Sequence, residues 1–406
     1  LCCASRSWDA IVVLSRGVVL SPICTSAPDF MDLADLTPRL LLGPGPSPVD
    51  PRILEAMARP TLGHLDPQFL QVMDAVNEGL REVFGTRNAL TFPVSGTGSA
   101  AQEAAMVNLL EPGDTAIIGI NGVFGGRLAE MARRAGATVV PVEADWGRIV
   151  EPDQIRQALR SHPEARLVAV VAAETSTGVW QPLDEIGAVV GETDALLVVD
   201  AVTALAGTPV EVDAVGIDVC YSGTQKCLGV PPGLGPITFS EKALSRIRGR
   251  SAPPQSWYLD ASLLAEYVGE GAQRRYHHTA PVNMMYGLLE GLHMVREEGL
   301  DARYSRHARV GRRLKAELVD RGFTLFAQEG HRLPQLTSAL LPEGLEEGPL
   351  RRRLLDEHQI EVGGGLGAAA GKLWRIGLMG SGATDENVDR LLQAVDAVLP
   401  SATVQG

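Results

Sequence analysis

Residues 195–200 read Ala-Leu-Leu-Val-Val-Asp, five apolar residues that end on an aspartate. An apolar run of this length predicts a strand that is buried on both faces, as in a parallel sheet covered by helices. Similar runs at residues 115–120, 138–142 and 167–173 alternate with helical patterns at residues 123–136, 152–162 and 183–192. This alternation predicts an α/β fold with a mostly parallel, helix-flanked sheet.

The pattern changes towards the C-terminus. Residues 217–222 and 236–240 add two strand candidates around a Gly/Pro-rich loop, and long helical patterns follow at residues 283–298 and 302–321. Shorter strands are predicted at residues 337–341 and 373–378, with a last helix from Thr384. The domains that we expect are an N-terminal arm at residues 31–50, a large domain at 51–285 and a smaller α+β domain at 286–406.

The first 30 residues differ from the rest of the chain. They hold three of the five cysteines, and their apolar run at residues 11–14 is short and is followed by Arg16. A signal peptide usually has a longer apolar segment. We expect residues 1–30 to be a non-native or disordered extension and leave them out of the fold prediction.

The charge balance restricts the classes of partner. Asp and Glu number 49 against 36 Lys and Arg, which gives a net charge of −13 and disfavours nucleic acid. The run Arg351-Arg352-Arg353 is interpreted as one solvated helix face. No cysteine or histidine spacing typical of a metal site occurs, and no apolar stretch is long enough to span a membrane. A cytoplasmic location and no metal are therefore expected.

Amine chemistry has only four possible positions. The chain contains 32 arginines and four lysines, which are Lys226, Lys242, Lys315 and Lys372. Lys226 lies in the segment Gly223-Thr-Gln-Lys-Cys227, directly after a predicted strand. Asp200 stands 26 residues earlier, at the end of another strand. Because ligands bind at the carboxyl ends of such strands, both residues are candidates for one site. The alternatives are a turn aspartate and a surface lysine.

Two glycine-containing segments add to these candidates. Val94-Ser-Gly-Thr-Gly-Ser-Ala100 joins a predicted strand to a predicted helix, where free N–H groups can bind phosphate. Asn121-Gly-Val-Phe-Gly-Gly-Arg127 places an aromatic ring between glycines at a strand end, where it could stack on a flat ligand or simply pack. The run Gly363-Gly364-Gly365 is interpreted as a flexible loop. A phosphate, a flat ring, a carboxylate partner and a reactive lysine together point to pyridoxal 5′-phosphate.

Further motifs give the chain a family resemblance. It resembles the class V, fold type I pyridoxal-phosphate aminotransferases, and within them the alanine–glyoxylate and serine–glyoxylate aminotransferases, from Leu40 to about residue 400. The motifs that carry the resemblance are Gly43-Pro-Gly-Pro-Ser47, Glu174-Thr-Ser-Thr-Gly178, Val199-Asp-Ala-Val202, Ser222-Gly-Thr-Gln-Lys-Cys227, Tyr276-His-His-Thr279 and Trp374-Arg-Ile-Gly377. It implies a large domain with a mostly parallel sheet of the seven-stranded type and a smaller C-terminal domain.

The resemblance also implies roles around the cofactor ring. Lys226 would bind the cofactor covalently as a Schiff base, and Asp200 would pair with the pyridinium nitrogen. Phe124 would stack on one face of the ring and Val202 would pack on the other. Thr175 would bond the phenolic oxygen of the ring.

For the phosphate and the substrate, the resemblance implies a second set of residues. The backbone groups of Ser95, Gly96 and Thr97 and the side chain of Gln225 would hold the phosphate. The neighbouring subunit's phosphate would be reached by Tyr276 and Thr279, so a homodimer is expected. In the substrate site, Gly45 would line the pocket and Arg375 would clamp the substrate carboxylate, because its planar fork matches a carboxylate.

The expected reaction moves an amino group from alanine or serine to glyoxylate. The choice of donor and the range of acceptors stay open. Ureidoglycine as donor and a pyridoxal-phosphate lyase are alternatives within the family, although relatives that act on ureidoglycine tend to have Asn where Tyr276 stands. A cysteine desulfurase is disfavoured because Gln225, rather than His, precedes Lys226. A non-catalytic dimer is disfavoured by the intact Asp200 and Lys226.

Overall fold

The computed structural model describes residues 31–269 and 274–400, which fall into two compact units. Of the first unit, residues 1–38, the described part holds one 3-10 helix, Leu33–Asp35. The Asp32 side chain accepts a hydrogen bond from the Ala34 N–H at the start of this helix. The extension predicted for residues 1–30 lies outside the described residues. All other elements belong to the second unit, residues 39–406.

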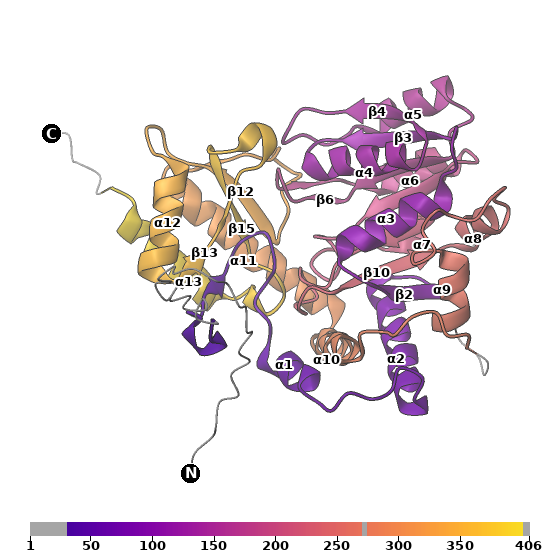
Figure 1. Ribbon diagram of the computed structural model, residues 1–406. Helices are drawn as coiled ribbons and strands as arrows, with labels where there is room; N and C mark the ends of the chain where they lie inside the picture. Colours follow the sequence, from indigo (N-terminus) through magenta and orange to yellow (C-terminus); the bar gives the residue numbers. More distant parts are fainter. Residues whose placement is uncertain (1–30, 270–273, 401–406) are drawn as a thin grey trace, which may run out of the picture. The chain divides into compact units, whose positions relative to one another are not determined.

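A seven-stranded sheet forms the centre of the larger part of this unit (Figure 1). Its strands are, in spatial order, β2 (Leu90–Ser95), β10 (Leu234–Phe239), β9 (Val219–Tyr221), β8 (Leu196–Asp200), β5 (Leu167–Val171), β3 (Thr115–Ile120) and β4 (Thr138–Glu143). β10 pairs antiparallel with both of its neighbours, β2 and β9, and all the other pairs in this sheet are parallel. The prediction of a mostly parallel sheet in an α/β fold is confirmed.

Helices flank the sheet along its length (Figure 1). They are α2 (Pro67–Phe84), α3 (Gly98–Leu109), α4 (Val123–Arg134), α5 (Pro152–Ser161), α6 (Asp184–Gly191), α7 (Val212–Val215), α8 (Glu241–Arg248) and α9 (Ala261–Val268). Two further helices, α1 (Pro51–Met57) and α10 (Val282–Glu298), lie farther from the strands: α1 packs against α10, and α10 packs against α2. The ends of α2 follow from local chemistry: Asp66 caps its first turn through the Gln68 N–H, and Gly85 ends it at φ 66°.

A second sheet contains β11 (Thr324–Leu325), β12 (Leu336–Leu340), β15 (Leu373–Gly377) and β14 (Gly363–Gly364), in that order. The helices near it in sequence are α11 (Leu300–Asp320), α12 (Glu347–His358) and α13 (Asp385–Val398). Short pairs complete the fold: β1 (Leu40–Leu41) with β13 (Ile360–Glu361), and β6 (Ala173–Glu174) with β7 (Val179–Trp180).

The prediction of a flexible loop at Gly363-Gly364-Gly365 was wrong for its first two residues, which form β14 and pair with β15. A Cβ atom at Gly363 would lie 2.4 Å from the Pro44 Cδ atom. The glycine therefore allows a close approach between two segments. A glycine run alone cannot distinguish this role from flexibility.

The apolar side chains gather in two main clusters. The larger surrounds the seven-stranded sheet, extends into α10 and also includes Leu333, Leu336 and Met379. The other joins β12 and β15 to α11, α12 and α13, with Trp374 fully buried at its centre. Because the larger cluster includes residues beyond 285, the division into domains at residues 51–285 and 286–406 stays a prediction. None of the helices in the described ranges is long and apolar enough to cross a membrane.

Candidate active site

Lys226 lies in the loop between β9 and β10, with its amine against the segment that contains Gly45. The Lys226 Nζ atom donates a hydrogen bond to the Pro44 carbonyl. Gly45 has φ 114°, and a Cβ atom there would lie 2.6 Å from Nζ. Only glycine tolerates this conformation and this approach. Burial, reinforced by the positive charge of Arg375, lowers the pKa of Lys226 to about 8.

The backbone beside Lys226 is held from two directions. On one side, the Ser47 N–H donates to the Gln225 carbonyl at 2.9 Å, and the Ser47 hydroxyl donates to the Lys226 carbonyl at 2.7 Å. On the other, the Arg303 Nη2 atom donates to the Cys227 carbonyl at 2.6 Å. The lysine therefore extends from a fixed section of backbone.

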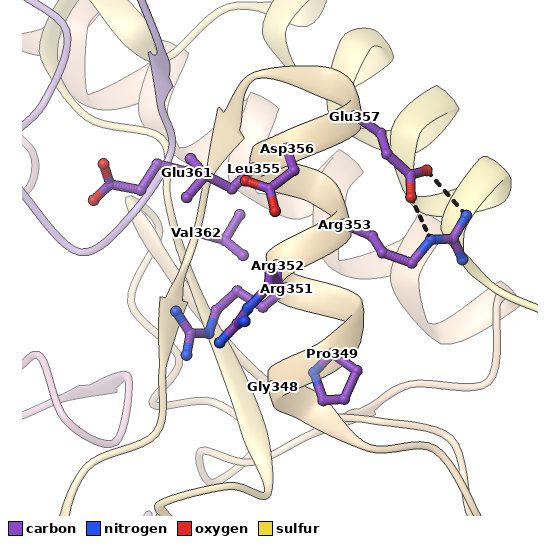
Figure 2. Close-up of a pocket in the computed structure, with 10 residues that line it drawn as sticks. All are labelled: Gly348, Pro349, Arg351, Arg352, Arg353, Leu355, Asp356, Glu357, Glu361 and Val362. Carbon is purple, nitrogen blue, oxygen red and sulfur yellow. Dashed lines mark hydrogen bonds and ion pairs between the residues drawn. The ribbon is translucent and has the colours of Figure 1, made fainter. Parts of the chain in front are cut away.

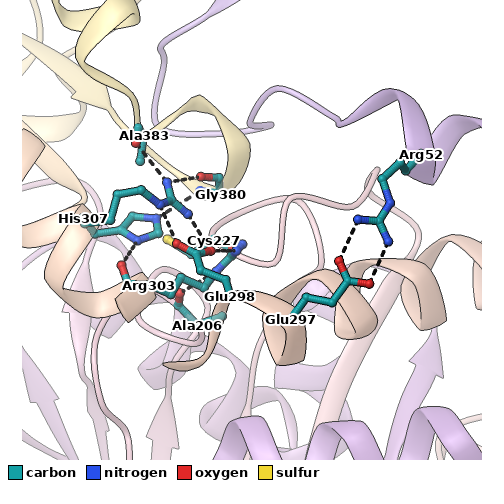
Figure 3. Close-up of polar contacts among 10 residues, drawn as sticks. Arg52, Ala206, Cys227, Glu297, Glu298, Arg303, His307, Gly380 and Ala383 are labelled. Atoms are coloured by element: carbon teal, nitrogen blue, oxygen red, sulfur yellow. Dashed lines mark hydrogen bonds and ion pairs between the residues drawn. The ribbon is translucent and has the colours of Figure 1, made fainter. Parts of the chain in front are cut away.

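Arg303, in α11, belongs to an ion network that it shares with Glu298 at the end of α10 (Figure 3). It pairs with Glu298 at 2.7 Å, and Glu298 also accepts from Arg306 at 2.6 Å. Arg306 in turn donates to the carbonyls of Gly380 and Ala383, both at 2.9 Å. One glutamate thus joins two arginines.

His307 adds a further link in the same region (Figure 3). The Gly380 N–H donates to His307 Nε2, so the ring proton lies on Nδ1 and is donated to the Arg303 carbonyl. Burial lowers the pKa of His307 to about 4, which keeps the ring neutral. The segment around Gly380 is therefore tied to the loop that carries Lys226.

Asp200 ends β8 at the edge where the chain also leaves β9. Its register partners are Val171 and Tyr221. One carboxylate oxygen accepts from the Val202 N–H at 2.9 Å, and the other accepts from the Tyr221 hydroxyl at 3.0 Å. Burial raises the pKa of Asp200 to about 6, and these two hydrogen bonds act in the opposite direction. A cation bound beside it would lower that pKa again.

Phe124 lies in the first turn of α4, which a buried glutamate holds in place. The Glu174 carboxylate accepts hydrogen bonds from the N–H groups of Phe124 and Gly125 at 3.0 and 3.3 Å. It also accepts from the N–H and hydroxyl groups of Ser176. A Cβ atom at Gly122 would lie 2.4 Å from the Glu174 carboxyl carbon. The glycine spacing seen in the sequence thus makes room for this glutamate.

The predicted phosphate loop leads into α3. Thr97 is the N-cap residue of α3, yet its side chain makes no capping bond. The first N–H groups of a helix have no helical partner, so this terminus can receive an anion. A Cβ atom at Gly98 would lie 3.2 Å from both the Val202 Cγ2 atom and the Ser222 carbonyl oxygen. The loop is therefore packed against the segments that hold Asp200 and Lys226.

Gln225 and Gly96 complete the surroundings of that loop. The Gln225 Oε1 atom is buried and has no hydrogen-bond partner among the described residues. A Cβ atom at Gly223 would lie 2.8 Å from it, so the amide folds back over Gly223. The Gly96 N–H donates to the Gly233 carbonyl at 3.0 Å and so fixes the loop to the strand beside it.

Arg375 and Thr175 meet although they are 200 residues apart in the sequence. The guanidinium of Arg375, in β15, donates to the Gly364 carbonyl at 2.8 Å and to the Thr175 carbonyl at 3.3 Å. Burial lowers the pKa of Arg375, and the Thr175 hydroxyl lies 2.6 Å from the Thr203 hydroxyl. Arg375 therefore lies beside Thr175, and the Thr175 side chain contacts Thr203, which follows Asp200 closely in the sequence.

Tyr276 and Thr279 lie on a different loop, before α10. Tyr276 is 54% exposed, and its hydroxyl is 3.4 Å from the Thr279 hydroxyl. No hydrogen bond joins either side chain to Lys226 or Asp200 among the described residues. The resemblance assigns both to the site of a neighbouring subunit, and that assignment stays a prediction.

Three residues of this site were not identified from the sequence. Tyr221 donates to Asp200, Glu174 holds Phe124, and the Arg127 guanidinium lies 4.8 Å from the centre of the Phe124 ring. A tyrosine at the carboxyl end of an apolar strand was a usable signal for the first. Glu174 and Arg127 lay inside quoted motifs, but no partner could be named for them.

A hollow of about 640 Å³ lies elsewhere, beside α12 (Figure 2). The residues that line it include Arg351-Arg352-Arg353, and none is a predicted site residue. Arg353 pairs with Glu357 at 2.8 Å, and Arg351 pairs with Glu347. Within the described ranges, no group of three or more His, Cys, Asp or Glu side chains could hold a metal ion.

Most of the chain matches a known protein family. The family model for aminotransferase class V matches residues 41–391. The chain belongs to the class V aminotransferases. The sequence-based assignment to that family, to its fold and to the transaminases is therefore confirmed.

Several class V aminotransferases are similar over nearly the whole chain. The alanine–glyoxylate aminotransferase of Felis catus is 42% identical over 363 residues, which cover 89% of this chain and 87% of that protein. The (S)-ureidoglycine–glyoxylate transaminase of Bacillus subtilis is 38% identical over 379 residues, covering 89% and 90%. A crystal structure of alanine–glyoxylate aminotransferase from Nostoc sp. has a TM-score of 0.89 and 45% identity, covering 91% and 98%.

Proposed function

We propose that this class V aminotransferase uses pyridoxal 5′-phosphate to move an amino group from alanine or serine to glyoxylate, giving glycine and a 2-oxo acid. The observation that carries the proposal is the placement of the Lys226 amine. It has a lowered pKa, lies against Gly45, and follows the strand that pairs with the end of β8 at Asp200. An amine with a lowered pKa near a buried carboxylate suits covalent attachment of a pyridine aldehyde, because the amine loses its proton more readily than an ordinary lysine.

The described residues fit this cofactor. The uncapped start of α3, which directly follows Ser95, Gly96 and Thr97, offers N–H groups to a phosphate. Gln225 would donate to the phosphate through its amide nitrogen, because a phosphate offers only acceptors; its amide oxygen has no hydrogen-bond partner among the described residues. We propose that Phe124 and Val202 enclose the ring and that Thr175 bonds its phenolic oxygen.

When bound, the cofactor supplies an electron sink for the electrons of the substrate Cα–H bond. Asp200 would support this by holding a proton on the ring nitrogen, because its buried carboxylate is a strong partner for a cation. Lys226, once replaced by the substrate amine, would take the Cα proton as a general base and return it as an acid. Its lowered pKa favours the neutral form required for that role.

Arg375 is the proposed clamp for the substrate carboxylate. Two of its nitrogens already bond backbone carbonyls, which fixes the plane of the guanidinium. A carboxylate can accept from the remaining N–H groups, and Gly45 keeps the space beside Lys226 free of side-chain atoms. Alanine, serine and glyoxylate all carry the carboxylate that this site requires.

The proposal includes a homodimer in which Tyr276 and Thr279 reach the partner's phosphate, and a cytoplasmic location. The relatives named for alanine–glyoxylate transfer, at 40–42% identity, support alanine as a donor. Tyr276 weighs against ureidoglycine, the donor in the name of the Bacillus subtilis relative.

A donor–acceptor matrix tests this function. L-alanine, L-serine and ureidoglycine would each be combined with glyoxylate, pyruvate and hydroxypyruvate, and the 2-oxo acid and amino acid products measured. We expect turnover with alanine or serine when glyoxylate is the acceptor. Turnover with ureidoglycine alone would contradict the proposed donor, and product formation without an acceptor would indicate a lyase.

A further inference from the structure

A hydrogen-bonded histidine pair adjoins the proposed phosphate loop. The Ser95 hydroxyl, at the end of β2, lies 2.7 Å from His278 Nε2. His278 Nδ1 lies 2.8 Å from His277 Nδ1, and His277 Nε2 lies 3.3 Å from the Trp257 carbonyl oxygen. These contacts form one chain that leads from the phosphate loop to a backbone carbonyl.

The carbonyl at the end of this series of hydrogen bonds determines which atom donates in each of them. The Trp257 oxygen can only accept, so His277 Nε2 carries a hydrogen. In the neutral ring, His277 Nδ1 must then accept, so the donor is His278 Nδ1. That leaves His278 Nε2 as the acceptor for the Ser95 hydroxyl. Without a ligand, therefore, Ser95 donates away from the phosphate loop.

The surroundings disfavour a positive charge on His278 in the absence of a ligand. Burial and the neighbouring His277 and His64 lower the pKa of His278 to about 4. The other titratable groups that face the rings are Tyr258 and Tyr267, from the segments on either side. Tyr276 lies on the same loop. None of these side chains is a carboxylate.

Binding of a phosphate would reverse the donor and acceptor roles in the hydrogen bonds from Ser95 to His278 and from His278 to His277. An anionic phosphate offers only acceptors, so a Ser95 hydroxyl that bonds it must donate to it. His278 Nε2 must then donate to Ser95, and His278 Nδ1 must accept from His277 Nδ1. His277 Nε2 still needs its hydrogen for the Trp257 carbonyl. The two rings would then hold three ring hydrogens instead of two, and the additional one comes from solvent as a proton.

The structure provides a position for the resulting charge. The His277 ring stacks on the Trp257 ring with 4.2 Å between centroids and 9° between planes. A flat cation over an indole face is stabilised by the ring quadrupole. The bound phosphate, connected through Ser95 and His278, supplies the opposite charge.

We propose that His277 and His278 are positioning residues of the phosphate site, which take up one proton when Ser95 turns its hydroxyl to a bound phosphate. The inference rests on the proposed function, because it requires the phosphate to bind at Ser95. It gives the histidine pair a direct role in cofactor binding.

Calorimetric proton counting on the full-length, cofactor-free protein tests this inference. Pyridoxamine 5′-phosphate is a suitable probe, because it cannot bind Lys226 covalently. The titration is done at pH 8. The second pKa of a phosphate is about 6, so the phosphate of the probe is already doubly charged at this pH. Two buffers of different ionisation enthalpy give the number of protons taken up. His277→Phe keeps a ring beside Trp257 but cannot take a proton. The matched control is His162→Phe, which replaces a half-buried ring beside Glu164, on a different part of the chain.

We expect the unmodified protein and His162→Phe to take up about one proton more per site than His277→Phe. The affinity of the unmodified protein should then fall about tenfold more per pH unit above pH 8 than that of His277→Phe. Ser95→Ala should also lose this proton while it still binds the probe through backbone N–H groups, and it serves if His277→Phe does not fold.

Equal proton numbers in the unmodified protein and in either site variant would overturn the inference alone. If the unmodified protein does not bind the probe, the proposed function fails and the inference fails with it. The two failures are thus distinguished by binding itself, without an activity measurement.

Discussion

At the scale of single residues, the site depends on groups whose protonation is shifted by burial. The pKa of Lys226 is lowered to about 8 and that of Asp200 is raised to about 6. Burial is the largest cause in both cases, since it disfavours the charged form of each. An amine that loses its proton readily and a buried carboxylate that can pair with a cation are complementary to a protonated pyridine aldehyde.

Asp200→Asn should reduce kcat by roughly 10- to 150-fold, because a hydrogen bond to a charged group contributes about 1.5–3 kcal/mol. Steady-state kinetics with saturating cofactor measures the effect. Tyr221→Phe removes only a hydrogen bond to the same carboxylate. It should cost about fivefold, as expected for about 1 kcal/mol. An Asp200→Asn enzyme as fast as the unmodified one would exclude the proposed role.

Arg375→Lys should lower kcat/KM by roughly 10- to 150-fold for donor and acceptor alike, because lysine cannot bond a carboxylate with two parallel N–H groups. Arg351→Lys is the matched control, since Arg351 lies on α12 and pairs with Glu347. A loss confined to one of the two substrates would contradict a shared carboxylate clamp at Arg375.

At the scale of elements, the start of α4 is set by Glu174 in β6. Its carboxylate takes four donated hydrogen bonds, two of them from the first turn of the helix that carries Phe124. Burial raises the pKa of Glu174, and the donors oppose that effect. A carboxylate at a helix N-terminus also interacts favourably with the helix dipole.

Glu174→Gln should lower the free energy of unfolding by about 1–3 kcal/mol, because the amide nitrogen would face N–H groups that lose their acceptor. Urea denaturation measures this difference. Glu192→Gln removes an exposed carboxylate that lies 3.5 Å from Arg156 and should change it by less than about 1 kcal/mol. Equal stability of the two variants would show that Glu174 does not hold α4.

Elements were predicted well where the pattern is local. β3 has the predicted bounds, Thr115–Ile120, because each of its residues contributes to one apolar run between turns. Asp200 and Lys226 followed from their positions at strand ends. Glu174 and His278 could not be assigned, because their partners lie 50 and 183 residues away in the sequence. Only the fold brings such pairs together.

At the scale of the second compact unit, residues 39–406, Glu298 connects the Lys226 loop to the segment around Gly380 (Figure 3). Burial raises the pKa of Glu298, but hydrogen bonds and the charges of Arg306 and Arg303 outweigh it, so the net pKa is lowered from 4.5. The stabilisation is therefore present above pH 4.5 and is lost as the pH falls through the lower, folded-state value.

Glu298→Gln should lower the free energy of unfolding by roughly 3 kcal/mol at pH 7, because it leaves Arg303 buried without its anion. The difference from the unmodified protein should shrink below pH 4.5, and urea denaturation at both pH values checks this. Glu297→Gln is the matched control, because Glu297 pairs with Arg52 at the surface and its loss should leave the free energy of unfolding nearly unchanged. Similar losses in both variants would contradict a buried network.

The central claim is that Lys226 alone of the four lysines performs the amine chemistry. The most direct test is the absorbance of purified protein with added pyridoxal 5′-phosphate, followed on addition of L-alanine or L-serine and then glyoxylate. We predict that the band of the lysine-bound cofactor bleaches with donor and returns with glyoxylate, and that Lys226→Ala shows neither band nor transamination while Lys372→Ala retains both. Transamination by Lys226→Ala would contradict the account.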